Sequence, residues 1–336
     1  MSTGILEIAR IAGVSKTTVS RVINKQANVN EETRRRVEKV IEEYNYIPNA
    51  RAQAFSSQKT MTIGLALTSD AADIFENPYF ADLMKGVFQE SRRNDYHVVI
   101  TYLAHGDSLA MVNRKLVDGI LVLTPGRDSR DELKELIDTE IPIVSTSRVE
   151  GLQELHYVAV DEYDASCKVM EHLIGFGHRR IGLILGPKKL YSNNARLRGY
   201  KTVLKKYDIP FDPELVRFGD TSANSGHDQM NELLNTHRDM TAVFACSDMM
   251  AIGAKRAVEE HNLRIPADIS LVSSDGISLS ELLGIGLTTM NQPTYERGRL
   301  ATEHLIRMIR GEDVGDSVML QMDISFHAST EQRPSR

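Results

Sequence analysis

Four polar side chains near residue 20 have the types and spacing needed to bind nucleic acid. They are Lys16, Thr17, Ser20 and Arg21, and a helix would present all four on one side. Lysine, arginine and hydroxyl side chains donate hydrogen bonds to phosphate oxygens and to base edges in the major groove of DNA. The pattern therefore predicts a helix that reads DNA.

The segments around this helix predict a unit of three helices. Gly13 permits a turn between the first two, because glycine tolerates backbone angles that other residues avoid. Ser15 and Asn30 are expected to cap the second and third helices, since their side-chain oxygens can accept a free backbone N–H. The residues expected to face inward are Ile5, Ile8, Ala9, Ala12, Val19, Val22, Ile23, Val37, Val40, Ile41 and Tyr44. This arrangement is a helix-turn-helix, which places one helix in the major groove; the alternative is a generic three-helix bundle with solvated charges.

Charge is distributed unevenly along the 336 residues. Residues 1–60 contain 10 Lys and Arg against 6 Asp and Glu, a net charge of +4. The remaining residues contain 30 and 40, a net charge of −10, which leaves −6 for the whole chain. A basic N-terminal segment on an otherwise acidic chain suits a protein that binds phosphate groups through that segment only.

The sequence lacks the motifs of several other kinds of chemistry. It has no phosphate-binding P-loop, no dinucleotide-binding glycine motif and no serine-nucleophile motif, so an enzyme is not expected. His172 and His178 are six residues apart and would not share a helix face, which argues against a metal site, and no cofactor is predicted. Cys167 and Cys246 are expected to be buried thiols. With no signal peptide and no membrane-spanning run, the sequence predicts a cytoplasmic protein.

Beyond Thr60, strand-like apolar segments alternate with helical ones. The first series of strands is predicted at 63–67, 98–100, 119–123 and 141–144, and the second at 158–160, 181–185, 242–245 and 269–272. Two such series predict two open parallel α/β sheets. Ligands bind beyond the carboxyl ends of the strands in sheets of this kind, so two lobes would place a cleft between them.

Eight short motifs, which run in order over nearly the whole chain, give it a resemblance to a known family. They are Ala12–Ser15, Thr18–Asn24, Tyr46–Ala52, Asn77–Phe80, Val117–Ile120, Gly177–Ile181, Thr241–Phe244 and Ile269–Val272. On these residues the chain resembles the lac-repressor (LacI/GalR) family of bacterial regulators. The resemblance implies an N-terminal all-α helix-turn-helix DNA-binding domain and an α/β two-lobed core with the periplasmic-binding-protein-like (type I) fold.

The resemblance also implies a division of the chain. The expected parts are a helix-turn-helix DNA-binding domain at 1–48, a hinge helix and linker at 49–60, and an effector-binding core at 61–336. A core of this fold crosses three times between its lobes, and the crossings are expected near Val160-Asp161, near Met290-Asn291-Gln292 and near Gln321-Met322. Lobe 1 would then comprise about 61–160 and 291–320, and lobe 2 about 161–290 and 321–336.

Further DNA contacts are implied by the resemblance. Beyond the recognition helix they are Asn24, Asn49, Arg51, Ala52 and Phe55. Phe55 stands where relatives usually carry a leucine that wedges between the central base pairs; the alternative is a phenylalanine packed on the core. The hinge segment is too short for a stable helix in water and is expected to fold on DNA. Two copies related by a two-fold axis would read a near-palindromic operator, so a homodimer is predicted.

The effector contacts implied by the resemblance follow the strands of both lobes. They are Ser69, Asp70, Tyr79, Phe80, Ser147, Arg148, Ser192, Asn193, Arg196, Ser247, Asp248 and Asp275. Aspartate and arginine bind sugar hydroxyls as acceptor and donor, while an aromatic side chain covers the apolar side of the ring. Arg196 and Asp275 form the centre of the predicted site, and Ser147 and Ser247 depart from the residues that many relatives carry. A loop or capping role is the alternative for each contact.

The resemblance implies a sequence-specific transcriptional repressor of carbohydrate-utilisation genes whose operator affinity is controlled by a small sugar. The long segment Thr68–Glu76 and the segment Ser278–Leu283 resemble those of maltose-type (α-glucoside) regulators. A phosphosugar or a phosphoprotein co-regulator is the alternative. The alternatives of other classes are a sugar receptor without gene regulation and a DNA-binding structural protein without an effector.

Overall fold

The computed structural model describes residues 4–23, 28–46, 59–68, 74, 76–277 and 286–333. The chain divides into two compact units, Met1–Met61 and Thr62–Arg336. Each unit buries a hydrophobic core of its own.

The smaller unit consists of three short helices. They are α1 (Ile5–Ala12), α2 (Lys16–Ile23) and α3 (Glu31–Glu43). Gly13 has a left-handed backbone conformation (φ 66°) that turns the chain between α1 and α2. The Ser15 hydroxyl accepts the backbone N–H of Thr18 at 3.0 Å, and the Asn30 side chain accepts that of Glu32 at 2.8 Å. Both predicted helix caps are therefore confirmed.

Apolar side chains fill the centre of this unit. The buried residues are Ile8, Ala9, Ala12, Val19, Val22, Val37 and Val40, and Ile5, Ile23 and Ile41 pack against them while partly exposed. The prediction that Tyr44 faces inward is wrong, because its side chain is 45% exposed. Helix α3 ends at Glu43 and Tyr44 is its C-cap, so the helical spacing no longer directs that side chain toward the core. Tyr46 packs against the core instead.

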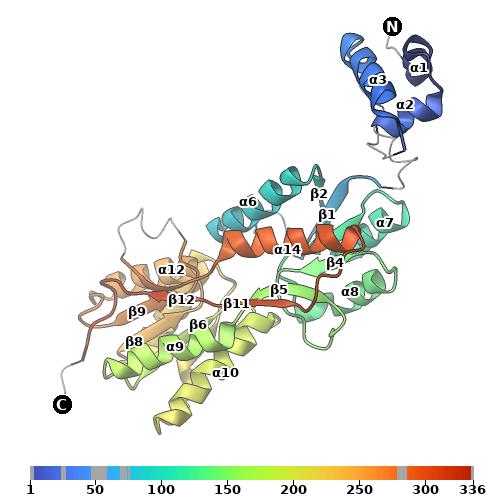
Figure 1. Cartoon of the computed structure of the whole chain (residues 1–336). Helices are drawn as coiled ribbons and strands as arrows, with labels where there is room; N and C mark the ends of the chain where they lie inside the picture. Colours follow the sequence, from blue (N-terminus) through green and yellow to red (C-terminus); the bar gives the residue numbers. More distant parts are fainter. Residues whose placement is uncertain are drawn as a thin grey trace. The chain divides into compact units, whose positions relative to one another are not determined.

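The larger unit contains two six-stranded sheets, each flanked by helices (Figure 1). The elements of lobe 1 are β1 (Thr62–Leu67), α6 (Pro78–Arg93), β2 (His97–Tyr102), η1 (Ala104–Gly106), α7 (Asp107–Asn113), β3 (Gly119–Val122), η2 (Arg127–Ser129), α8 (Arg130–Ile137), β4 (Ile143–Ser145), β5 (His156–Val160), α14 (Thr294–Ile309) and β11 (Val318–Leu320). The elements of lobe 2 are α9 (Glu162–Gly175), β6 (Ile181–Leu185), α10 (Tyr191–Lys206), η3 (Pro213–Leu215), β7 (Val216–Phe218), α11 (Ala223–Thr236), β8 (Ala242–Ala245), α12 (Asp248–Glu260), β9 (Ser270–Ser273), β10 (Thr288–Asn291) and β12 (Asp323–Ser325). The predicted class, a helical unit plus a two-lobed α/β core, is confirmed.

The two sheets have equivalent strand orders and differ in the direction of the last strand. The strand order of the first is β2-β1-β3-β4-β5-β11, and its neighbours are parallel. The order of the second is β7-β6-β8-β9-β10-β12, in which β12 is antiparallel to β10 and the other neighbours are parallel. In each sheet the order reverses at the first strand of the lobe, β1 or β6. Such a reversal opens a crevice at the carboxyl ends of the strands.

Helices cover both faces of each sheet. In lobe 1, α6 packs against α14 on one face, while α7 and α8 lie on the other (Figure 1). Gly86 and Gly298 let α6 and α14 approach closely, because a Cβ at Gly86 would collide with the Tyr295 carbonyl oxygen and one at Gly298 with that of Leu83. In lobe 2, α9 pairs with α10 and α11 with α12. Helix α14 therefore belongs to lobe 1 although it follows most of lobe 2 in the sequence.

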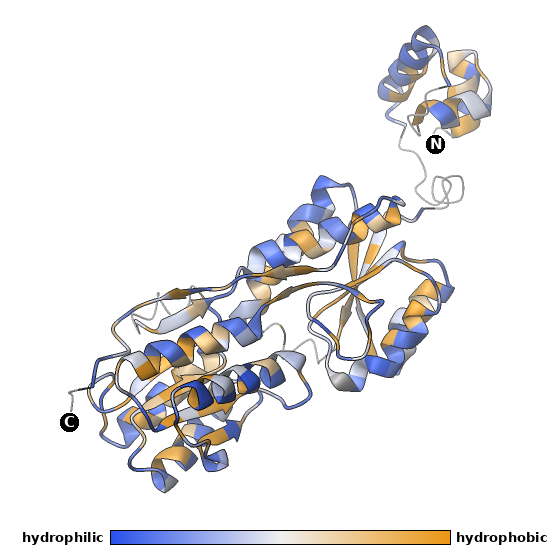
Figure 2. Cartoon of the chain, turned by 60° about the horizontal axis from the view of Figure 1, so that its bottom comes forward, coloured by the Kyte–Doolittle hydropathy of each residue, from blue (hydrophilic) through white to orange (hydrophobic). Residues whose placement is uncertain are grey.

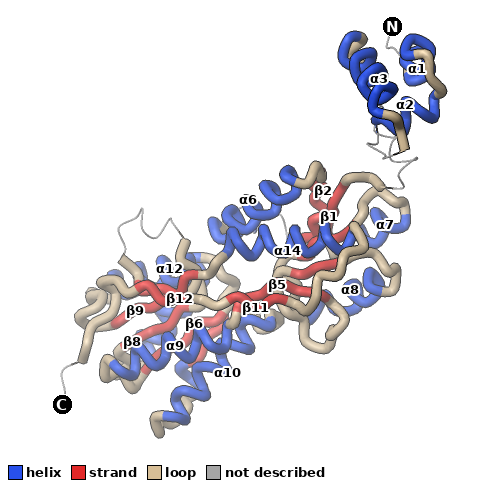
Figure 3. The backbone as a smooth tube through the Cα atoms, viewed as in Figure 1, coloured by secondary structure: helices blue, strands red, loops and turns tan. Residues whose placement is uncertain are grey.

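The chain passes between the two sheets at three places. These lie between β5 and α9, between β10 and α14, and between β11 and β12 (Figure 3). Each lobe is thus assembled from segments that are distant in the sequence. A movement of one lobe relative to the other must bend all three connections.

The burial of the strands follows their hydrophobic pattern. Strands β3 and β8 are buried throughout, as their continuous apolar sequences predict, and the strands are largely hydrophobic in Figure 2. Strand β2 lies at an edge, where Val99 is 41% exposed and Ile100 is 40% exposed. An apolar run alone therefore does not distinguish a central strand from an edge strand.

Candidate functional site

A cavity of about 570 Å³ lies where the carboxyl ends of the strands of both lobes meet. The predicted effector contacts that line it are Tyr79, Phe80, Ser147, Ser192, Asn193, Arg196, Ser247 and Asp275. Its wall also includes Thr68 and Thr124 from lobe 1 and Thr221 from lobe 2, each in the loop that follows a strand. This is the place at which doubly wound sheets bind ligands.

Four of the predicted contacts do not form part of the cavity as described. Ser69 and Asp70 lie outside the described residues. Arg148 is exposed and stacks on the Tyr191 ring, 5.5 Å from its centroid. Asp248 is fully buried, and its carboxylate is already occupied by hydrogen bonds from the protein. The structure therefore does not bring Asp248 to the wall of the cavity, because its side chain is buried and hydrogen-bonded within the protein.

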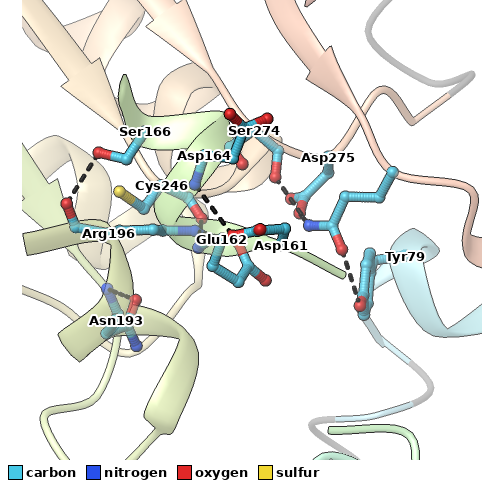
Figure 4. Close-up of polar contacts among 12 residues, drawn as sticks. Tyr79, Asp161, Glu162, Asp164, Ser166, Asn193, Arg196, Cys246, Ser274 and Asp275 are labelled. Atoms are coloured by element: carbon cyan, nitrogen blue, oxygen red, sulfur yellow. Dashed lines mark hydrogen bonds and ion pairs between the residues drawn. The ribbon is translucent and has the colours of Figure 1, made fainter. Parts of the chain in front are cut away.

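A buried ion pair holds the predicted central arginine. Arg196, on α10, donates from Nε to Glu162 at 2.7 Å and from Nη1 to the Cys246 carbonyl oxygen at 2.6 Å (Figure 4). Both side chains of the pair are nearly inaccessible, 7% and 8% exposed. Burial raises the pKa of Glu162, and the Arg196 guanidinium opposes that rise. Two of the five N–H donors of Arg196 are therefore used by the protein itself.

A second network holds Asp275 after β9. One carboxylate oxygen of Asp275 accepts the Asp248 backbone N–H at 2.8 Å, and the other accepts from the Gln292 amide at 2.9 Å. The Gln292 side-chain oxygen in turn accepts the Tyr79 hydroxyl at 3.3 Å. Burial, followed by the charge of Asp248, raises the pKa of Asp275 well above its usual range. Because Tyr79 belongs to lobe 1 and Asp275 to lobe 2, the network joins the lobes across the cavity (Figure 4).

Aromatic and amide side chains shape the remaining wall. The rings of Tyr79 and Phe80 lie edge to face, with centroids 5.2 Å apart. Asn193 accepts from the Gly186 backbone N–H at 3.2 Å and donates to the Pro187 carbonyl oxygen at 2.9 Å, so it fixes the loop after β6. The cavity thus combines an aromatic surface with carboxylate, hydroxyl and amide groups. That combination suits a polyhydroxylated ligand with an apolar ring face.

Several residues that line the cavity were not anticipated from the sequence, and three of them carry side chains that matter for the site. Glu162 begins α9 at a lobe crossing, Gln292 lies in another crossing, and Arg297 is on α14. The family resemblance implies crossings near both positions, so polar residues within the implied crossings are a usable signal for Glu162 and Gln292. Arg297 lies four residues before the buried Ala301, and a charge on an apolar helix stripe is its signal.

The helical unit presents a polar face on α2. Lys16, Thr17 and Arg21 are exposed there and Ser20 is half-buried, whereas Val19 and Val22 point into the core. Exposed cations and a hydroxyl group on one face are the groups that contact DNA. Asn24, Asn49, Arg51, Ala52 and Phe55 lie outside the described residues.

The described part of the chain provides neither a metal-binding cluster nor a membrane-spanning helix. Among the described residues, no cluster of three or more His, Cys, Asp or Glu side chains could hold a metal ion. No helix in the described part of the chain is long and apolar enough to cross a membrane. Burial raises the pKa of the Cys246 thiol to about 12, so this cysteine is not an activated nucleophile.

Comparisons with known proteins agree with this architecture. Residues 4–49 match "Bacterial regulatory proteins, lacI family", and residues 170–330 match "Periplasmic binding protein-like domain". The chain is 33% identical over 312 residues to the HTH-type transcriptional regulator CelR of Thermobifida fusca, covering 91% of each chain. It is 35% identical over 314 residues to the ribose operon repressor of Haemophilus influenzae, covering 90% of this chain and 91% of that one.

Solved structures of the same architecture cover almost the whole chain. A transcriptional regulator CelR–cellobiose complex has a TM-score of 0.76 and 30% identity, covering 97% of this chain and 99% of that one. The lac repressor dimer bound to operator and the anti-inducer ONPF has a TM-score of 0.82 and 28% identity, covering 98% and 100%.

A helix-turn-helix unit and a two-lobed α/β unit with a cavity define a DNA-binding regulator with a receptor-like core. The chain belongs to the LacI family of bacterial regulatory proteins. The relatives are transcriptional regulators, which confirms the prediction that the chain is not an enzyme.

Proposed function

We propose that this protein is a repressor of carbohydrate-utilisation genes whose affinity for its operator is controlled by a sugar in the cavity. The observation that carries the proposal is the cavity itself, which combines polar groups with aromatic side chains and is built by both lobes. Similar proteins support it, since one was solved as a CelR–cellobiose complex and another is a ribose operon repressor. Residues 1–48 would bind DNA, 49–60 would form the hinge, and 61–336 would bind the effector.

The contacts between the lobes provide a means of control. Lys189 in lobe 2 pairs with Asp128 in lobe 1 at 2.8 Å, and Gln292 connects Tyr79 to Asp275. A ligand that competes for these groups changes the relative stability of open and closed lobes. Ligand affinity and operator affinity are then coupled reciprocally, typically by about 1–3 kcal/mol.

The proposed DNA-binding form is a homodimer that binds a near-palindromic operator. The recognition residues are Lys16, Thr17, Ser20 and Arg21 on α2, supplemented by Asn24, Asn49, Arg51, Ala52 and Phe55. Two copies related by a two-fold axis present two recognition helices to two half-sites. Arg21 can bind guanine through two hydrogen bonds, which supplies base preference.

The ligand proposed from the sequence is a maltose-type α-glucoside, with a phosphosugar or a phosphoprotein co-regulator as the alternative. Its contacts would be the predicted residues that line the cavity and the predicted Ser69 and Asp70. Three lining residues found in the structure would join them, namely Glu162, Gln292 and Arg297. A bound sugar would have its apolar ring face against the Tyr79–Phe80 surface and its hydroxyls toward the polar residues of the wall.

Gel-shift titration of the full chain on its operator, with and without sugars, tests the proposal. A sugar that raises the melting temperature should also lower operator affinity, because a ligand that binds one state shifts the equilibrium toward it. Arg21→Ala serves as the control, since it should lose operator affinity but keep the thermal shift. Operator binding that no cavity ligand changes would contradict the proposal.

A further inference from the structure

Arg297 is a buried cation whose hydrogen-bond donors are mostly unused. It lines the cavity from the first turn of α14, and 3% of its surface is exposed. Its Nε and Nη2 atoms are buried without a hydrogen-bond partner, and Nη1 donates one long hydrogen bond of 3.4 Å to Gln292. The first turn of a helix already favours negative charge, so the surroundings of Arg297 are electropositive. A buried positive charge without a counter-ion is stabilised when an anion binds beside it.

The other cations that line the cavity are neutralised by the protein. Arg196 pairs with Glu162 at 2.7 Å, and Lys189 pairs with Asp128 at 2.8 Å. Arg297 has no such carboxylate partner within the described residues. Burial lowers the pKa of Arg297 to about 10, with no carboxylate opposing the change, and at neutral pH the side chain is still a cation. No described residue supplies its counter-ion, so Arg297 offers an unpaired cation to a bound anion.

The surroundings of Arg297 indicate what kind of anion fits. The Tyr79 ring covers one face of the guanidinium, with its centroid 5.3 Å from Cζ, and supplies a cation–π contact but no acceptor in the guanidinium plane. Nε and Nη2 lie on one edge of the guanidinium. Two oxygens of a carboxylate or a phosphate match such an edge, and a sugar hydroxyl supplies only one.

We propose that the effector is an anionic sugar whose carboxylate or phosphate oxygens pair with Arg297, while its hydroxyls contact Asp275 and the neighbouring polar groups. This inference rests on the proposed function and selects a charged ligand over a neutral α-glucoside. One uncompensated cation matches the single charge of a sugar acid better than the nearly double charge of a phosphate monoester. Sugar acids are therefore the first ligands to test.

Calorimetric titration of the full chain separates the ligand classes. The probes are glucuronate, galacturonate and gluconate as carboxylates, glucose 6-phosphate as a phosphate, and glucose, maltose and cellobiose as neutral sugars. We expect an anionic probe to bind, with affinity falling on the order of 100-fold in Arg297→Leu, because a charge-assisted pair is lost. Arg297→Lys retains the positive charge but lacks the two parallel N–H donors of the guanidinium, so it should bind the anionic probe with intermediate affinity.

Arg307→Leu is the matched control on the same helix. Arg307 pairs with Glu312 at the surface at 3.2 Å, and it is absent from the wall of the cavity. This variant should bind the anionic probe as the wild type does. Thermal melting without ligand reports folding, and Arg297→Leu should melt no lower than the wild type, since leucine replaces an uncompensated buried charge.

Three outcomes would count against the inference in different ways. Undiminished binding of the anionic probe by Arg297→Leu would overturn it. If a neutral sugar binds wild type and Arg297→Leu equally and weakens operator binding, while no anion binds, the inference fails and the proposed function stands. If no sugar of either kind binds or changes operator affinity, both fail.

Discussion

Replacement of Arg196 by methionine tests how the lobe 2 side of the cavity is held together. Arg196→Met keeps the length of the side chain but removes the groups that bind Glu162 and the Cys246 carbonyl oxygen. Both acceptors are then left unpaired in a nearly dry site, since the Glu162 side chain is 8% exposed. A loss of stability is therefore expected even without ligand.

The expected loss is large because one partner of a buried pair remains. Removing one side of such a pair costs about 3–5 kcal/mol. For a domain of about this size, that corresponds to a melting temperature roughly 6–20 °C below wild type. Without the opposing guanidinium, burial raises the pKa of Glu162 further. A protonated Glu162 is less costly to bury, so the defect should be greatest near about pH 8 and shrink as the pH falls to about 5.

Urea and thermal unfolding, followed by circular dichroism at several pH values, measure this loss. Arg198→Met, at an exposed position on the same helix, is the control and should change stability by less than about 0.5 kcal/mol. The double variant Glu162→Leu/Arg196→Met should return to within about 1–2 kcal/mol of wild type. A loss below about 1 kcal/mol in Arg196→Met, or a double variant as unstable as the sum of its single changes, would refute the reasoning.

Three further predictions concern the DNA-binding face and the Asp275 network. Arg21→Ala should weaken operator binding by roughly 1–3 kcal/mol in gel shifts and relax base preference, with ligand affinity unchanged; full affinity would remove α2 as the recognition helix. Gln292→Leu breaks the link from Tyr79 to Asp275 and should alter the ligand response of operator binding; an unchanged response would show that the link carries no coupling. Because the folded-state pKa of Asp275 is raised, its stabilising contribution is present at low pH and declines as pH rises. Asp275→Asn should flatten that decline in melts between about pH 5 and 8; an unaltered slope would assign the decline to other groups.

The fold could be predicted wherever the pattern of a segment decides its structure. The apolar run Ile181–Leu185 becomes a central strand, and Asn30 caps a helix. Strands β7, β10, β11 and β12 were not predicted, because each is three or four residues long and none carries a buried apolar run. Pairing with neighbouring strands, which are often distant in the sequence, determines these elements.

The positions of the site residues in the sequence could be predicted, but their ion-pair and hydrogen-bond partners could not. Polar residues at strand ends, such as Ser247 and Asp275, line the cavity as parallel sheets require. That Arg196 pairs with Glu162 depends on the packing of α9 against α10, which neither segment encodes alone. The burial of Arg297 likewise depends on α14 returning to lobe 1 after the chain has passed through lobe 2.

Both sheets are completed by strands that are synthesised late. Strands β11 and β12, within residues 318–325, close one edge of each sheet, and α14 arrives only shortly before them. The helices of the DNA-reading unit, by contrast, end at Glu43. At typical translation rates of about 5–20 residues per second, roughly 15–60 s separate the two events. During that interval the nascent chain carries the folded three-helix unit while neither sheet of the larger unit has all of its strands.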